Sequence, residues 1–276
     1  MQNPLKSRRK EKMLEDKSKK TKKTREKWDE HANRYDEWYK TFKGAVEHHV
    51  DWTLLKGYLP KNKNAKILDA AGGTGRITLP LAKMGYSVTL CDISPAMLNV
   101  AKQKLRKEGL LNKVEISECD IHKLRFADET FDFVLCWDGM IEAAKELIRV
   151  TKKGGTLSIF LMNKCGNAID KFPEEPDSAL GMLKSEPSYF YDEEHKYMAV
   201  TPEEAREFFE KEGIKVTEIY AVCGMLQLLS IPDRVLKSRK WDEKLFKQTT
   251  EMLLTLSKEP STKGFSRHLV LYGQRI

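Results

Sequence analysis

The stretch ILDAAGGTGRITLPLAKMGYSVTLCDIS, residues 67–94, carries the most distinctive pattern in the chain. A short apolar run leads into three glycines within four positions, and a helix-like segment, a turn and a second apolar run that ends at Asp92 follow. Glycine allows the backbone to approach a ligand closely, and the helix behind it presents N–H groups at the same point. The stretch therefore predicts a strand, a ligand-binding loop, a helix and a second strand.

Strands and helices are expected to alternate on both sides of this stretch. The patterning predicts strands at 66–69, 87–91, 114–118, 131–136 and 156–161, and helices at 76–84, 95–108 and 143–150. Such alternation is typical of right-handed crossovers on a parallel sheet that is covered by helices on both faces. A helix capped by Thr201, and strands at 216–222 and 268–272, are expected to complete the sheet, so the predicted fold class is α/β.

The remaining segments suggest one domain with additions. Residues 28–60 place aromatic and apolar side chains at helical spacings and predict amphipathic N-terminal helices before the core of residues 64–161. Residues 163–200 are rich in proline, glycine, acids and aromatics without a clear period, and we interpret them as an insertion or lid. We expect a single domain over 28–276, with substrate-side lid segments at 163–200 and 231–262.

Residues 1–27 hold twelve lysines and arginines against four acids, an excess of eight that equals the whole chain's net charge of +8. A basic segment with almost no aromatic residues cannot bury enough apolar surface to fold alone, which predicts a flexible tail. One interpretation is an RNA-binding arm that contacts phosphates outside the glycine-loop site and gains affinity by counterion release. The other is a solubilising tail.

Composition narrows the class of protein further. No window approaches the roughly 18 apolar residues of a membrane span, which predicts a soluble, cytoplasmic protein. The five cysteines are odd in number and show no C-x-x-C spacing, so we expect reduced side chains rather than disulfides or metal ligands. The pair His48-His49 has no third ligand at a convincing spacing, and no metal is expected.

The glycine loop alone does not identify its ligand, because dinucleotide-binding enzymes share the layout. Here an acid, Asp69, precedes the loop, and no glycine follows three positions after Gly75. An acid at that point suits a ligand with an ammonium group better than a pyrophosphate. Asp92, at the end of the second strand, can accept hydrogen bonds from both hydroxyls of a ribose.

Five segments in order resemble the motifs of the class I S-adenosylmethionine-dependent methyltransferases, and the resemblance extends over about residues 28–160. The segments are DAAGGTG (69–75), CDIS (91–94), CDI (119–121), FDFVLC (131–136) and RVTKKGG (149–155). The resemblance implies a seven-stranded, doubly wound Rossmann-like methyltransferase sheet with N-terminal helices and an inserted lid. It also implies S-adenosyl-L-methionine as the cofactor.

By this resemblance the glycine loop takes the methionyl part of the cofactor and Asp92 takes the ribose. Ile93 flanks the adenine, and Asp120 with Ile121 lies beside its amino group. Of the N-terminal aromatic residues, Tyr35 is the one expected to close over the methyl donor. The complete expected cofactor site is Tyr35, Asp69, Ala71, Gly72, Gly73, Gly75, Asp92, Ile93, Asp120, Ile121 and Cys136.

Two departures from the family pattern concern the site. Ala71 stands where the family usually has glycine, a change that is tolerated if the backbone there does not need a positive φ. In place of the D-P-P-Y type tetrapeptide that grips an exocyclic amine, the chain has Trp137-Asp138-Gly139. Methyl transfer needs aligned reactants, and a base only if the acceptor must lose a proton. Asp138 and, less directly, Asn163 are the candidates to orient or deprotonate the acceptor.

The sequence leaves three functions open: methylation of RNA, methylation of a small molecule, and cofactor binding without catalysis. The basic tail favours a nucleobase in RNA, either rRNA or tRNA, and this is the reading we prefer at this point. The formally neutral body favours a small molecule enclosed by the lid. The third alternative is a non-catalytic protein that binds S-adenosylmethionine, which the intact glycine loop and Asp92 disfavour.

Overall fold

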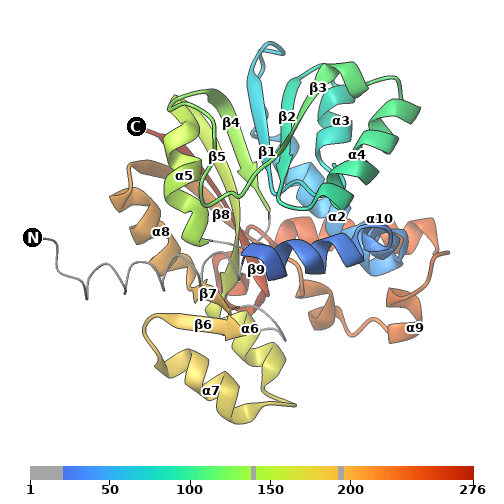
Figure 1. Cartoon of the computed structure of the whole chain (residues 1–276). Helices are drawn as coiled ribbons and strands as arrows, with labels where there is room; N and C mark the ends of the chain where they lie inside the picture. The colour runs from blue at the N-terminus through green and yellow to red at the C-terminus, as the bar shows by residue number, and fades with distance from the viewer. Residues whose placement is uncertain (1–20, 138–140, 192–195) are drawn as a thin grey trace, which may run out of the picture.

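The computed structural model of the chain describes residues 21–137, 141–191 and 196–276. Its strands are β1 (Lys66–Ala70), β2 (Ser87–Asp92), β3 (Val114–Glu118), β4 (Phe131–Cys136), β5 (Thr151–Asn163), β6 (Ser188–Tyr191), β7 (Lys196–Val200), β8 (Ile214–Val222) and β9 (His268–Arg275). They form one sheet in the order β3-β2-β1-β4-β5-β7-β6, and β9 joins β5 to β8. Figure 1 shows helices on both sides of this sheet.

The α-helices are α2 (Phe42–Lys56), α3 (Thr78–Lys83), α4 (Pro95–Lys107), α5 (Ala144–Val150), α6 (Lys164–Lys171), α7 (Pro176–Lys184), α8 (Pro202–Lys211), α9 (Asp233–Leu236) and α10 (Glu243–Leu256). Short 3-10 helices are η1 (Tyr35–Lys40), η2 (Leu111–Lys113), η3 (Ile141–Ala143), η4 (Met225–Leu229) and η5 (Pro260–Phe265). Residues 21–31 are also helical. Among the described residues, no helix is long and apolar enough to cross a membrane.

The five strands β1 to β5 run parallel, so their carboxyl ends meet at one edge of the sheet. Ala70, at the end of β1, pairs with Cys91 on one side and Cys136 on the other. In open α/β sheets this edge, where the strand order reverses, is the place at which ligands bind. β9 runs antiparallel to both β5 and β8 and closes the far side.

Alternate strand residues serve two separate hydrophobic layers. Ile67 and Phe133 point into the layer that contains side chains of α2, α3 and α10. Leu68 and Val134 point to the other face, into the layer that contains side chains of α5 and α8. All four side chains are fully buried, and burying each one stabilises the fold by about 1.5–3 kcal/mol.

The predicted helix starts are confirmed. The Ser94 side chain accepts a hydrogen bond from the Met97 N–H, which caps α4, and Pro95 occupies the first turn. Thr201 and Glu204 form a capping box at the start of α8. These signals lie within four residues of each helix start, which is why the sequence alone reveals them.

The predicted doubly wound α/β fold is confirmed, with a seven-stranded core extended by the hairpin of β6 and β7. Residues 163–200, which the sequence suggests are an insertion or lid, contain α6, α7 and this hairpin. β7 joins the sheet through the pair Met162 and Ala199. The pairing depends on a contact between residues far apart in the sequence, and no local alternation of apolar and polar residues indicates it. Figure 1 shows α7 and β6 projecting from the body of the molecule.

Candidate functional site

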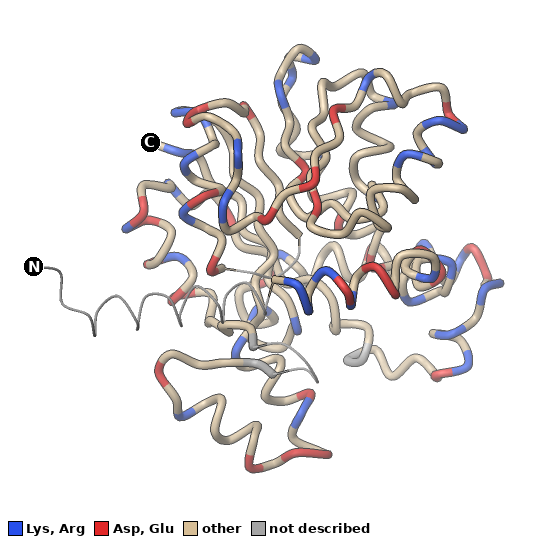
Figure 2. The backbone as a smooth tube through the Cα atoms, in the orientation of Figure 1, with Lys and Arg blue, Asp and Glu red and all other residues tan. Residues whose placement is uncertain are grey.

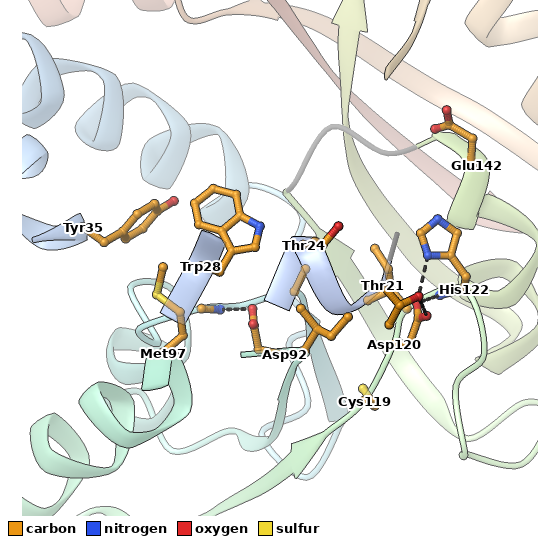
Figure 3. A pocket seen from close by; sticks show the side chains of 14 residues that line it. Thr21, Thr24, Trp28, Tyr35, Asp92, Met97, Cys119, Asp120, His122 and Glu142 are labelled. Carbon is orange, nitrogen blue, oxygen red and sulfur yellow. Dashed lines mark hydrogen bonds and ion pairs between the residues drawn. The ribbon is translucent and has the colours of Figure 1, made fainter. Parts of the chain in front are cut away.

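A cavity of about 430 Å³ lies at the carboxyl edge of β1, β2 and β3 (Figure 3). This volume falls within the range of about 300–1,000 Å³ that is typical of cofactor and ligand sites. The lining residues are Thr21, Thr24, Trp28, Tyr35, Ala71, Gly73, Asp92, Ile93, Met97, Cys119, Asp120, Ile121, His122 and Glu142. We call this cavity the cofactor pocket.

The glycine loop is held against the second strand by its own backbone. The Gly72 N–H donates to the Cys91 carbonyl at 3.1 Å, and a Cβ at Gly72 would lie 2.4 Å from the Leu90 side chain. Gly73 has a φ of +53°, which an L side chain rarely adopts, and its N–H donates to Asp92 Oδ2 at 2.9 Å. The loop therefore places bare backbone at the floor of the pocket.

Ala71 occupies the loop with a φ of +54°. The sequence pattern made this alanine acceptable only if the position did not need a positive φ, and the structure shows that it does. A left-handed conformation costs an L-residue about 1–2 kcal/mol, so Ala71 stores strain next to the pocket.

Replacing Ala71 by glycine is therefore expected to stabilise the protein. Relief of about 1–2 kcal/mol of strain exceeds the roughly 0.4–1 kcal/mol that glycine costs through the freer unfolded chain, which leaves a net gain of about 0.5–1 kcal/mol. Urea unfolding measures this gain. Ala70→Gly, at a fully buried strand position, is the matched control and should destabilise the protein. If A71G were less stable than the wild type, the claim that Ala71 is strained would be wrong.

Asp92 is the central acid of the pocket. Its Oδ1 accepts from the Ser94 N–H at 2.8 Å while its Oδ2 accepts from Gly73. Burial raises the pKa of this carboxyl, and the two backbone donors act in the opposite direction by favouring its charged form. A carboxylate has about four lone-pair sites, so the oxygens that face the pocket keep capacity for two ribose hydroxyls.

A second acid, Asp120, lies at the other end of the pocket. Its Oδ1 accepts from His122 Nδ1 at 2.8 Å and from the His122 N–H at 2.9 Å. The hydrogen bond from the His122 side chain lowers the pKa of this carboxyl. Figure 3 shows His122 and Glu142 beyond Asp120, and Tyr35 at the opposite end of the pocket.

The helix of residues 21–31 lies across the open side of the pocket. Arg25 Nε donates to the Ile93 carbonyl at 3.2 Å, and the Arg25 guanidinium forms an ion pair with Glu118. These contacts attach the helix to the ends of β2 and β3. Figure 3 shows Thr24 and Trp28 on this helix beside Asp92.

A second set of contacts fixes the same helix to the start of α4. Asp29 Oδ1 accepts from Ser94 Oγ at 2.6 Å and from the Ala96 N–H at 3.1 Å. An acid at a helix N-terminus also interacts favourably with the helix dipole. The helix of residues 21–31, which we call the covering helix, is therefore part of the pocket wall.

This arrangement corrects the expected position of the tail. Residues 1–27 were predicted to form a flexible arm outside the cofactor site, but residues 21–27 belong to the covering helix, and Thr21 and Thr24 line the pocket. The charge pattern gave no sign of this, because the contacts of Arg25 and Asp29 join residues that are more than 60 positions apart. Residues 1–20 lie outside the described part of the chain.

Aromatic residues close the end of the pocket nearest the glycine loop. Trp28 and Tyr35, which both line the pocket, meet edge to face with ring centroids 6.0 Å apart. Tyr39 packs on Tyr35 in the same way at 5.9 Å. The sequence pattern favoured Tyr35 and passed over Trp28, whose helical spacing suggested a simple packing face.

Several of the expected cofactor residues support the loop rather than line the pocket. Asp69 is 2% exposed and accepts from Thr78 Oγ1 at 2.6 Å, and burial raises its pKa to about 6. Its carboxylate thus fixes the start of α3. Cys136 is fully buried at the end of β4. Gly75, with a φ of +72°, donates its N–H to Gly72 and shapes the turn from inside.

Of the two candidates for orienting the acceptor, only Asn163 lies within the described residues. Asn163 is fully buried, and its Nδ2 donates at 2.7 Å to the carbonyls of Lys263 and Ser266. Its amide therefore joins the end of β5 to η5 and does not line the pocket, so we assign Asn163 a structural role. Asp138 lies outside the described residues.

Directly after the glycine loop, Arg76 forms a buried polar group with residues of α2. Arg76 donates from Nη1 to His48 Nδ1 at 2.7 Å, and its guanidinium stacks 4.5 Å from the Tyr39 ring centroid. Asp51 Oδ2 lies 3.9 Å from Arg76 Nη1, close enough for an ion pair but too far for a hydrogen bond. Burial raises the pKa of Asp51 to about 7 and, together with Arg76, lowers that of His48 to about 4.

The raised pKa of Asp51 predicts a pH dependence of stability. Between the usual value near 3.8 and the folded value of about 7, the folded state binds more protons than the unfolded state. The free energy of unfolding should therefore fall as pH rises through this window, by at most about 1.4 kcal/mol per pH unit. Asp51→Asn should lose this part of the slope, as measured by urea unfolding between pH 4.5 and 7.5. If the free energy of unfolding changed with pH in the same way for the wild type and Asp51→Asn, the pKa of Asp51 would not be raised in the folded protein.

Part of the chain matches a known family of domains. Residues 67–155 match the family described as "Methyltransferase domain". A ubiquinone/menaquinone biosynthesis C-methyltransferase UbiE from Pectobacterium carotovorum is 32% identical over 111 residues, which are 37% of this chain and 44% of that protein. The chain thus spans about half the length of the curated relatives it matches.

Two solved structures have similar folds. A possible histamine N-methyltransferase from Thermotoga maritima superimposes with a TM-score of 0.55 and 19% identity, covering 90% of this chain and 98% of that one. Geranyl diphosphate C-methyltransferase from Streptomyces coelicolor A3(2) gives a TM-score of 0.53 and 11% identity, covering 83% and 78%. The fold is that of the class I methyltransferases, and the cofactor of such domains is S-adenosylmethionine.

Proposed function

We propose that this chain, whose residues 67–155 form an S-adenosylmethionine-dependent methyltransferase domain, transfers the cofactor's methyl group to a small molecule. The observation that carries the proposal is the cofactor pocket, in which Gly73 and Asp92 meet at 2.9 Å beneath the covering helix. Asp92 holds the ribose, the loop backbone holds the methionyl part, and the covering helix excludes water from the sulfonium.

Methyl transfer is an in-line displacement at a carbon that the sulfonium already activates. The residues of the chain therefore contribute mainly by binding and aligning the two reactants. Tyr35 and Trp28 close the pocket over the loop, where the methionyl part is expected to lie. Among the described residues, no cluster of three or more His, Cys, Asp or Glu side chains is arranged to hold a metal ion, and the proposal includes none.

Two observations favour a small molecule over RNA as the acceptor. The matched relatives and structures are named for quinone, histamine and geranyl diphosphate substrates. In addition, the last seven residues of the basic tail form part of the covering helix, where Arg25 is paired with Glu118. Figure 2 shows positions of Lys and Arg interspersed with positions of Asp and Glu along the backbone of the body.

RNA stays as a second candidate acceptor because residues 1–20 hold eight lysines and arginines against three acids. If this segment binds phosphates, its removal should weaken RNA binding and reduce the salt dependence of that binding. Filter binding of total RNA at two salt concentrations measures both effects. Equal affinity and equal slope after removal of residues 1–20 would exclude the segment as an RNA-binding arm.

The proposed function is tested by cofactor binding and by methyl transfer. Calorimetry should detect S-adenosylmethionine and S-adenosylhomocysteine binding, and radiolabelled methyl groups should pass to a small-molecule fraction of a cell extract rather than to its RNA. Absence of cofactor binding would overturn the proposal outright. If the label appeared only in nucleosides of the RNA fraction, RNA would replace a small molecule as the proposed acceptor.

A further inference from the structure

The short helix η1 contains an acid, Asp36, that does not itself line the cofactor pocket. It follows Tyr35, which does line the pocket. Asp36 Oδ1 accepts from Thr74 Oγ1 at 2.7 Å, and its Oδ2 accepts from Lys104 Nζ at 2.8 Å. Thr74 belongs to the glycine loop and Lys104 to α4, 38 and 68 positions away in the sequence. One carboxylate therefore joins three segments that surround the pocket.

These side-chain contacts matter because η1 has little other support. None of its six residues is buried, whereas seven residues of the following helix α2 are. Burial of apolar surface therefore contributes less to the position of η1 than to that of α2. A 3-10 helix of this length also has poorer internal hydrogen bonds than an α-helix. The position of η1 thus depends on the groups that attach it to other elements.

The attachment to the glycine loop is a hydrogen bond to a carboxylate. Thr74 is fully buried, and its hydroxyl has a single proton to donate, which goes to Asp36. Hydrogen bonds to an ionised acceptor are stronger than those between neutral groups. The side chains of Lys104 and Asp36 are 28% and 34% exposed, so water screens their ion pair only in part.

A second contact joins η1 to the residue that follows the loop. The Arg76 guanidinium lies 4.5 Å from the Tyr39 ring centroid, which is typical of a cation–π interaction. Asp36 and Tyr39 are three positions apart, and residues at this spacing share one side of a 3-10 helix. Two attachments on one side fix the orientation of η1 relative to the glycine loop as well as its distance from it.

The orientation of η1 determines where the Tyr35 ring lies. This ring packs edge to face on Trp28 and on Tyr39, with centroids 6.0 and 5.9 Å apart. Figure 3 shows it at the end of the pocket opposite His122. Because Tyr35 and Asp36 are neighbours in the chain, release of η1 from the loop would carry the ring away from the pocket.

We propose that Asp36 is a positioning residue: by attaching η1 to the glycine loop, it holds Tyr35 against the methionyl half of the cofactor. This inference rests on the proposed function and adds to it a residue that acts only through another. A purely structural acid would differ in one respect. Its loss would weaken the binding of every part of the cofactor alike.

The test compares two ligands in calorimetric titrations of the full chain. S-adenosylhomocysteine carries the amino-acid part of the cofactor, whereas adenosine carries only the adenine and the ribose. Asp36→Ala and the nearly isosteric Thr74→Val should each weaken S-adenosylhomocysteine binding about tenfold and leave adenosine binding within about twofold of the wild type. Thr74→Ser, which keeps the hydroxyl, should restore most of the affinity that Thr74→Val loses.

Glu37→Gln is the matched control. Glu37 is the next acid of η1, but it pairs with Lys40 and Arg239 and not with the glycine loop. This variant should bind both ligands like the wild type. A loss of S-adenosylhomocysteine affinity in Glu37→Gln as large as that in Asp36→Ala would assign the effect to the charge of η1 and overturn the role of the Thr74 contact.

A second background shows whether Asp36 acts through Tyr35. Residues that act as one unit give effects that do not add. In Tyr35→Ala protein, Asp36→Ala should therefore change S-adenosylhomocysteine affinity by less than about twofold. A full tenfold loss in this background, or an equal loss of adenosine and S-adenosylhomocysteine affinity in Asp36→Ala, would overturn the positioning role and leave the methyltransferase proposal standing. Failure of the wild type to bind S-adenosylmethionine or S-adenosylhomocysteine would overturn the proposed function itself.

Discussion

Asp92→Ala is expected to weaken S-adenosylmethionine binding by at least about 100-fold. Each hydrogen bond to a charged group contributes about 1.5–3 kcal/mol, so two lost bonds to the ribose give about 3–6 kcal/mol. The change also releases the Gly73 and Ser94 N–H groups that Asp92 holds at 2.9 and 2.8 Å, so the loop loses its anchor. Calorimetric titration with S-adenosylmethionine and S-adenosylhomocysteine measures the loss.

Glu115→Ala provides the matched control for this substitution. Glu115 is an exposed acid on the neighbouring strand β3, where it accepts from Thr89 Oγ1 at 3.2 Å and does not line the pocket. Its removal should leave cofactor affinity unchanged. If Asp92→Ala folded normally and bound the cofactor within threefold of the wild type, the ribose would have to lie elsewhere.

Loss of the covering helix is expected to have the second largest effect. Removing residues 1–31 should weaken cofactor binding by about 30-fold or more, because a tryptophan that packs against a bound ligand commonly contributes about 2 kcal/mol or more. Trp28 and the two threonines Thr21 and Thr24 all line the pocket from this helix. Most of the change should appear in the dissociation rate, which stopped-flow displacement resolves.

Two comparisons make this prediction specific. Removal of residues 1–20 alone should leave cofactor affinity unchanged, because Thr21, Thr24 and Trp28 of the covering helix are kept. Trp28→Ala should reproduce most of the effect, whereas Trp38→Ala should not, since Trp38 is 45% exposed and does not line the pocket. A weakened cofactor complex after removal of residues 1–20 would instead assign the effect to the tail's charge.

The fold could be predicted from the sequence because its signals are local. The glycine loop, the Ser94 cap and the acid at the end of β2 each depend on residues a few positions apart, and Ala71, Gly73, Asp92 and Ile93 line one pocket in the structure. Alternation of strand and helix then leaves few topologies to consider.

The rest of the site depends on contacts that no local pattern encodes. The composition of residues 21–27 indicates a solvated tail, and only Arg25 bonding to Ile93, 68 positions away, shows that the segment covers the pocket. The φ of Ala71 is set by the turn that the whole loop must make, not by alanine's own preference. Asn163 is the last residue of β5, a position where catalytic residues are often found, but its amide donates to the Lys263 carbonyl in η5.

The strand β9 has a consequence for the synthesis of the protein. Among the described strands β8 pairs with β9 alone, and β9 is also the partner of β5 along Thr156–Met162. During translation one edge of β5 and the whole of β8 therefore stay without that neighbour until residues 268–275 leave the ribosome. Unpaired strand edges are the places at which nascent chains associate wrongly. The pairing of β5 and β8 is thus completed only when the most C-terminal strand of this sheet has been made.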